Sequence, residues 1–136
     1  MLKRMKRILA PLVLLCAAAP ALAQRFDAEA VCAATDIALA YDCVIRLSAG
    51  DAPVEGAVLE VKADMPEMPM AHNVRPVPAE AAEEPGSYRV PLQLEMDGRW
   101  TLRLEITDPR RDVVILHQDF PPKEAAEDAG GHTHGQ

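Results

Sequence analysis

The sequence predicts an all-β fold, a single antiparallel β-sandwich of about seven strands. Three observations lead to this prediction. Short segments alternate apolar and polar residues, turn signals containing Gly, Pro and Asp separate them, and no long segment has the period of a helix. Prolines within several of these segments indicate edge strands, because proline cannot donate a hydrogen bond to a neighbouring strand.

The first 23 residues have the features of a secretory signal peptide. Four basic residues precede an apolar run at positions 8–19, and Ala21-Leu22-Ala23 then provides an A-x-A cleavage signal. The apolar run is too short for a comfortable membrane span. We therefore expect cleavage after Ala23, a periplasmic or secreted protein, and no stable membrane anchor after cleavage.

The charge of the chain excludes some classes of partner. The formal net charge is −7, and it becomes −11 when the four basic residues of the signal peptide are removed. An acidic exported protein is poorly suited to nucleic acid or anionic lipid, and its field favours cations. We expect no nucleic-acid partner.

Two cysteines remain after signal cleavage. In an oxidising compartment, Cys32 and Cys43 predict a structural disulfide that ties the N-terminal segment to the first strand. The alternative is a redox or thiolate copper site. Their separation differs from C-x-x-C, which argues against a thioredoxin-like reductant.

The expected domain covers residues 37–120. Residues 24–36 are alanine-rich with little periodicity, and we expect an irregular lead-in there. Strands are expected at 37–47, 54–63 and 113–120, with a short strand at 73–77 that prolines interrupt.

The alternation is most regular in residues 88–94 and 100–106, which we expect to form a hairpin. A three-residue loop of Met96, Asp97 and Gly98 would place Leu94 opposite Trp100 and keep the apolar residues on one face. Met96 would then lie at the hairpin tip, free to be a metal ligand. The alternative is an ordinary apolar turn residue.

Residues 65–72 combine three methionines and one histidine, Met65, Met68, Met70 and His72. A thioether has no proton to lose and prefers copper(I), and imidazole accepts either copper oxidation state. Two prolines favour an extended or polyproline-like loop on which several donors can converge. The alternative is that these methionines fill the core or form an adaptable apolar contact.

The C-terminal segment, residues 121–136, is acidic and rich in alanine and glycine, and we expect a disordered tail. Its His132 and His134 form a His-x-His pair, which is a weak candidate ligand set for divalent metal ions.

Three sequence elements stand out: Met65-Pro66-Glu67-Met68-Pro69-Met70-Ala71-His72, Gly86-Ser87-Tyr88 and Met96-Asp97-Gly98-Arg99-Trp100. Together they resemble the YtkA-like/FixH-like group of exported domains. The resemblance implies an immunoglobulin-like β-sandwich and extracytoplasmic copper handling, with Met65, Met68, Met70 and His72 as ligands and Met96 as a further candidate. FixH-like members are typically held by an N-terminal membrane helix, whereas this chain has a cleavable signal.

The leading functional hypothesis is a periplasmic copper(I) carrier or buffer that exchanges copper with a donating or receiving partner protein. The alternative is a metal-independent interaction module that uses the Met-Pro loop as an apolar contact. A short ligand set at an edge would also allow a homodimer to share one copper ion through the Met loops. The sequence contains no recognisable nucleophile–base pair, phosphate-binding glycine loop or zinc-type His/Glu spacing, so we expect no enzymatic activity.

Overall fold

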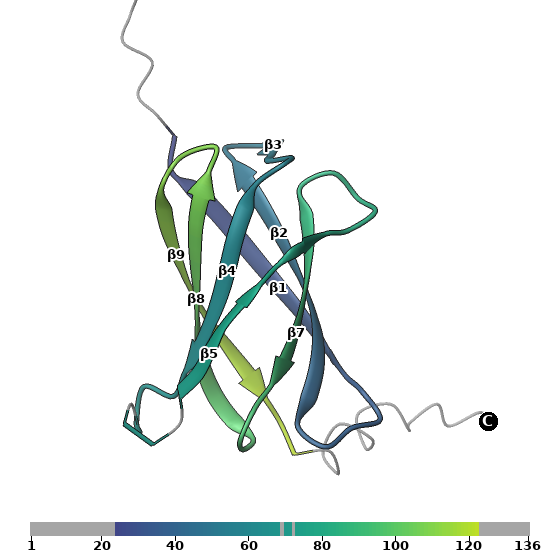
Figure 1. Ribbon diagram of the computed structural model, residues 1–136, viewed down its shortest axis with the longest axis vertical. Coiled ribbons are helices and arrows are strands. Elements are labelled where there is room, and N and C mark those ends of the chain that lie inside the picture. Colours follow the sequence, from purple (N-terminus) through teal and green to yellow (C-terminus); the bar gives the residue numbers. More distant parts are fainter. Residues whose placement is uncertain (1–23, 69, 72, 123–136) are drawn as a thin grey trace, which may run out of the picture.

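Two antiparallel sheets pack face to face in the computed structural model, which describes residues 24–68, 70–71 and 73–122 (Figure 1). The described residues form nine strands, of which β3 and β6 contain only two residues each. The all-β sandwich prediction is confirmed. The predicted signal peptide and the residues of the tail from 123 onward lie outside the described residues, and none of the described residues forms a helix able to cross a membrane.

The strands divide unevenly between the two sheets. One sheet has the order β1-β2-β7-β6 with β3 paired to β2, and the other has the order β5-β4-β8-β9. The strands are β1 (Phe26–Ala34), β2 (Ala40–Ala49), β3 (Ala52–Pro53), β4 (Val58–Asp64), β5 (Asn73–Pro78), β6 (Glu80–Ala81), β7 (Ser87–Gln93), β8 (Gly98–Asp108) and β9 (Asp112–Phe120).

The alternating apolar residues of the central strands form the core between the sheets. The inward positions of β2, β4, β7 and β8 are almost fully buried, and Trp100 has no exposed surface. This burial of one face of each strand accounts for the period of two in the sequence. The inward residues of these strands are Cys43, Ile45, Leu47, Leu59, Val61, Ala63, Tyr88, Val90, Leu92, Trp100, Leu102, Leu104 and Ile106.

The prediction of an irregular lead-in at residues 24–36 is wrong. Residues 26–34 form β1, which pairs with β2 along its whole length. Its inward side chains after Phe26 include Ala28 and Ala30, which are small and have a low strand propensity, so the alternation is weak in the sequence. Hydrogen bonding to β2 therefore stabilises residues 26–34 as a strand, although the local sequence pattern does not indicate one.

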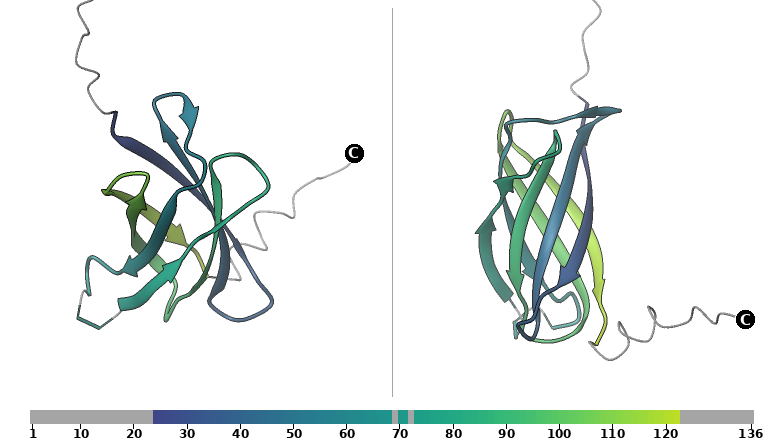
Figure 2. Two further views of the ribbon diagram at one scale, coloured as in Figure 1. Left: turned by 45° about the horizontal axis from the view of Figure 1, so that its top comes forward. Right: turned by 90° about the vertical axis from the view of Figure 1, so that its right-hand side faces the viewer.

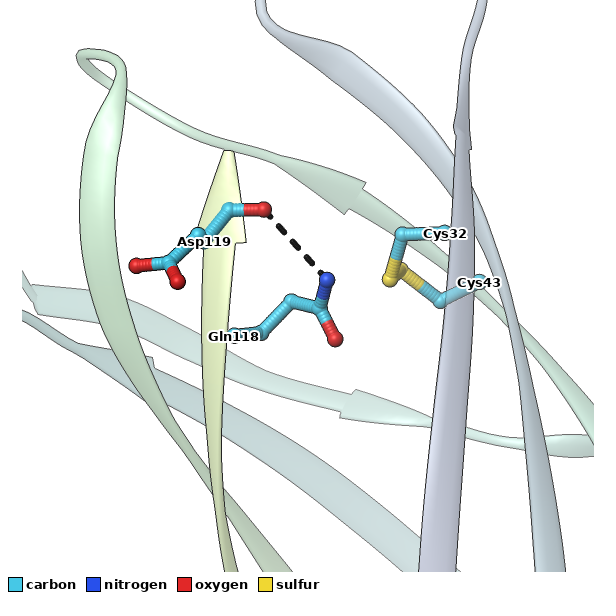
Figure 3. Close-up of a disulfide and its surroundings, with 4 residues drawn as sticks. All are labelled: Cys32, Cys43, Gln118 and Asp119. Atoms are coloured by element: carbon cyan, nitrogen blue, oxygen red, sulfur yellow. Dashed lines mark hydrogen bonds between the residues drawn. A yellow bond between two sulfur atoms is a disulfide. The ribbon is translucent and has the colours of Figure 1, made fainter. Parts of the chain in front are cut away.

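The disulfide prediction is confirmed. Cys32 and Cys43 lie directly opposite each other on β1 and β2, with their Cα atoms 4.0 Å apart. Figure 3 shows the side chain of Gln118 from β9 extending toward the bond. A disulfide of this kind is typical of an oxidising, extracytoplasmic compartment.

The predicted hairpin between residues 88–94 and 100–106 is wrong in its pairing. Each segment buries the face that its alternation indicates, but β7 pairs with β2 and β6, whereas β8 pairs with β4 and β9. The connection at residues 94–97 therefore passes from one sheet to the other. Period-two alternation identifies the buried face but not the partner strand, so a hairpin and a crossing between sheets give the same pattern.

One side of the sandwich is closed by β1 and β9, the edge strands of the two sheets (Figure 2). The backbone N–H of Phe26 donates a 3.2 Å hydrogen bond to the carboxylate of Asp112. This bond, the N–H of Val113 and the nearby Arg110 and Arg25 lower the pKa of Asp112. The Arg110 guanidinium also lies 4.0 Å from the centre of the Phe26 ring.

We expect Asp112→Asn to destabilise the protein at neutral pH by about 0.5–1 kcal/mol, a modest value because the carboxylate remains accessible to solvent. The pKa of Asp112 in the folded protein lies below its usual value of 3.8. The stabilisation is therefore present above that pH and is lost as the pH falls through the lowered pKa. Denaturant unfolding at neutral pH and at about pH 2 tests this, with Asp51→Asn in an exposed turn as the control. An equal effect at both pH values would contradict the prediction.

Candidate metal centre

The Met loop, residues 65–72, connects β4 to β5. Within it, the N–H of Met68 donates to the carbonyl of Met65 at 3.1 Å, and the N–H of Ala71 donates to the carbonyl of Met68 at 3.1 Å. These bonds define two successive turns, so the prediction of an extended or polyproline-like segment is wrong. Pro66 occupies the second position of the first turn, where its fixed φ is favourable.

The three methionines of the loop have very different exposures. Met65 is 5% exposed, Met68 is 38% exposed and Met70 is 98% exposed. Met65 continues the inward alternation of β4 by one step beyond Ala63, so its side chain enters the core. The turn that follows then carries Met68 and Met70 out to solvent.

The buried Met65 reaches the connection between the two sheets. A Cβ atom added to Gly98 would lie 3.1 Å from the terminal methyl carbon of Met65. Met96, two residues before Gly98, is half-buried against the core, and its carbonyl accepts a 3.1 Å hydrogen bond from Nε1 of Trp100. The fold therefore brings Met65 beside the segment that contains Met96, and it fixes the backbone of that segment through Trp100.

The Met loop and the 94–97 connection lie at the same end of the sandwich (Figures 1 and 2). Met96 is not at the tip of a hairpin, as the sequence analysis expected, but on a crossing between sheets. The remaining predicted ligands, His72, His132 and His134, lie outside the described residues.

A family model described as YtkA-like matches residues 36–105, just over half of the chain. The chain belongs to the YtkA-like family. Searches among curated proteins and among solved structures gave no match. The matched region contains the Met loop and Met96. Strands β1 and β9, which complete this YtkA-like sandwich, lie wholly outside it.

The other residues that carry the YtkA-like resemblance have structural roles. The hydroxyl of the buried Tyr88 donates to the carbonyl of Val54 and accepts from the N–H of Ala57 at 2.9 Å. Gly86 has φ of +74°, and a Cβ atom there would lie 2.7 Å from Pro53. These residues fix the opposite end of β7, and Trp100 fills the core between the sheets.

The donor set of this YtkA-like domain suits a soft metal ion. The described residues contain no group of three or more His, Cys, Asp or Glu side chains placed to hold a metal. Met68 and Met70 are the exposed methionines of the loop, and a methionine thioether is a neutral, polarisable donor that prefers copper(I). Met65 would have to leave the core to join them.

Sequence analysis missed one surface residue at this end of the molecule, Ile37. The alternation predicts a strand from residue 37, but the strand begins at Ala40, and Ile37 lies in the preceding loop with 68% of its surface exposed. The signal was Asp36, a residue type that is depleted in strands and favours turns, preceded by Thr35, whose hydroxyl can support a turn.

We expect Gly98→Ala to cost at least about 1 kcal/mol more stability than Gly56→Ala. Gly98 has φ of +130°, which lies beyond the left-handed helical region, and Met65 occupies the space beside it. Gly56 has φ of +67° and no atom within 4 Å of an added Cβ, so it provides a control for positive φ alone. Equal losses in chemical denaturation would show that the surroundings of Gly98 add no constraint.

Proposed function

We propose that this YtkA-like protein is a non-enzymatic periplasmic copper carrier or buffer that holds copper(I) through its Met loop. The observation that carries the proposal is the exposure of two thioethers, Met68 and Met70, on a short loop with defined turns. Thioethers favour copper(I) over hard or borderline cations. Family membership and the disulfide support an exported copper-handling protein.

Because the methionines differ in their exposure to solvent, we assign them different roles in the proposal. Met68 and Met70 bind the ion, with His72 as the third candidate ligand from the sequence. Met65 anchors the loop in the core, and the half-buried Met96 is available only in part. An open site of this kind suits a carrier, because its ligands can be exchanged one at a time with those of a partner.

Export follows from the predicted signal peptide and cleavage after Ala23. A copper-donating or copper-receiving protein in the same compartment is the proposed partner. Shared coordination by two copies of the Met loop is a further arrangement that the exposure of Met70 would permit.

The second candidate function is a metal-independent apolar contact. Met70 is 98% exposed, and methionine side chains adapt well to apolar partner surfaces. This function uses the same loop but requires no metal, so a copper titration separates the two proposals.

We expect the Met68→Leu/Met70→Leu variant to bind copper(I) at least about tenfold more weakly than the wild type, because leucine keeps the apolar volume but removes the sulfur. Competition with a chromophoric copper(I) chelator, using disulfide-intact protein, measures the affinity. Met65→Leu is the matched control and should keep its affinity, since the buried sulfur is not a proposed ligand.

Unchanged copper affinity in the double variant would remove Met68 and Met70 from the site. Absence of copper binding in the wild type would leave the apolar-contact function as the better account of the loop.

A further inference from the structure

A groove of about 610 Å³ opens at the end of the sandwich that carries Met96. Residues from three separate segments line it: the stretch from the end of β1 through the loop to the start of β2, the 94–97 connection and the chain directly after β9. Its lining is mostly apolar and includes Ile37, Leu39, Tyr41, Met96 and Pro121.

The β1–β2 loop that forms one wall of the groove is held in a defined shape. The N–H of Thr35 donates to the carbonyl of Ala40 at 3.0 Å, and the N–H of Ile37 donates to the hydroxyl of Thr35 at 3.2 Å. The N–H of Leu94 donates to the carbonyl of Leu39 at 2.9 Å, which ties the loop to the connection between the sheets. The loop is therefore fixed to the wall that contains Met96.

This fixed loop combines backbone strain with an exposed apolar side chain. Leu39 has φ of +60°, a conformation that a bulky side chain disfavours. Ile37, two residues earlier, is 68% exposed. Strain that the surrounding structure maintains is found most often at functional positions, and a rigid exposed apolar residue is suited to contact with a partner.

Charge complementarity indicates the kind of partner. Asp97 lines the groove, none of the residues that line it is Lys or Arg, and the formal net charge of the chain is −7. A second copy of this chain carries the same negative net charge, and residues 123–136 contain three acidic residues against one lysine. Both would be repelled by the acidic lining, whereas a basic segment would be attracted.

We propose that this groove is the docking site for the copper-exchange partner, and that the partner inserts an apolar side chain flanked by lysine or arginine residues. Met96 places a thioether in the wall of the groove, so a docked partner would lie beside a candidate copper ligand. The role of the docked partner in copper exchange rests on the proposed function, but the partner can bind to the groove without metal.

Amide NMR shifts of the metal-free, disulfide-intact protein without its signal peptide test the proposal. The probes are three synthetic peptides: a leucine flanked by lysines, the same peptide with glutamates in place of the lysines, and the lysine peptide with serine in place of leucine. Only the first should bind, with shifts concentrated at Ile37, Leu39, Met96 and Asp97.

Ile37→Ser should weaken binding of the lysine–leucine peptide at least about tenfold without unfolding the exposed loop. Val113→Ser is the matched control, because Val113 is an exposed valine on β9 that does not line the groove. Absence of binding, equal binding of the glutamate peptide, or unchanged binding by Ile37→Ser would overturn the proposal.

Two further measurements test the alternative occupants. Shifts at the groove amides on deletion of residues 123–136, without peptide, would assign the groove to the tail and overturn the proposal. Self-association in sedimentation that Ile37→Ser abolishes would assign it to a second copy and also overturn it. Copper titration of the same variants separates the two proposals. If the protein binds no copper, the peptide-binding result still stands. Ile37→Ser should leave the copper affinity unchanged.

Discussion

The structure depends on the packing of two apolar sheet faces around Trp100, which is fully buried between them. Each central strand contributes every second side chain to this core, so the outward side chains and the end loops are the parts left for other roles. Consecutive strands β7 and β8 lie in different sheets, and the connection between them must cross one end of the sandwich. That crossing carries Met96 to the end where the Met loop also lies.

The same packing explains why three closely spaced methionines are not equivalent. Met65 occupies the last inward position of the β4 alternation and belongs to the core, whereas the turn that follows exposes Met68 and Met70. Under the proposed function, binding or release of copper at these exposed residues would disturb few core contacts, so the sandwich would not have to repack. A core methionine would lose its packing to reach the ion, at a cost of about 1.5–3 kcal/mol for full exposure of the side chain.

Sequence patterns predicted the features that depend on residues close together in the sequence. The alternation of β2, β4, β7 and β8 identified their buried faces, and the two cysteines identified the disulfide. The failures concern partners that lie far apart in the sequence. Strand β1 was not predicted because its alanines give little alternation of apolar and polar residues. The crossing between β7 and β8 was not predicted because the regular alternation of these strands is equally compatible with a hairpin. The burial of Met65 agrees with the alternative that the methionines fill the core, and it follows from continuing the β4 period to position 65. The prolines of the loop favoured an extended segment instead.

The central claim is that the exposed methionines, and not the buried one, contact copper. The most direct measurement is NMR of the protein labelled with ¹³C at the methionine methyl groups, titrated with copper(I) in the absence of oxygen. The account predicts large shifts for the methyl groups of Met68 and Met70 and little change for Met65. A shift of Met65 as large as those of Met68 and Met70, or no shift of either exposed methionine, would contradict it.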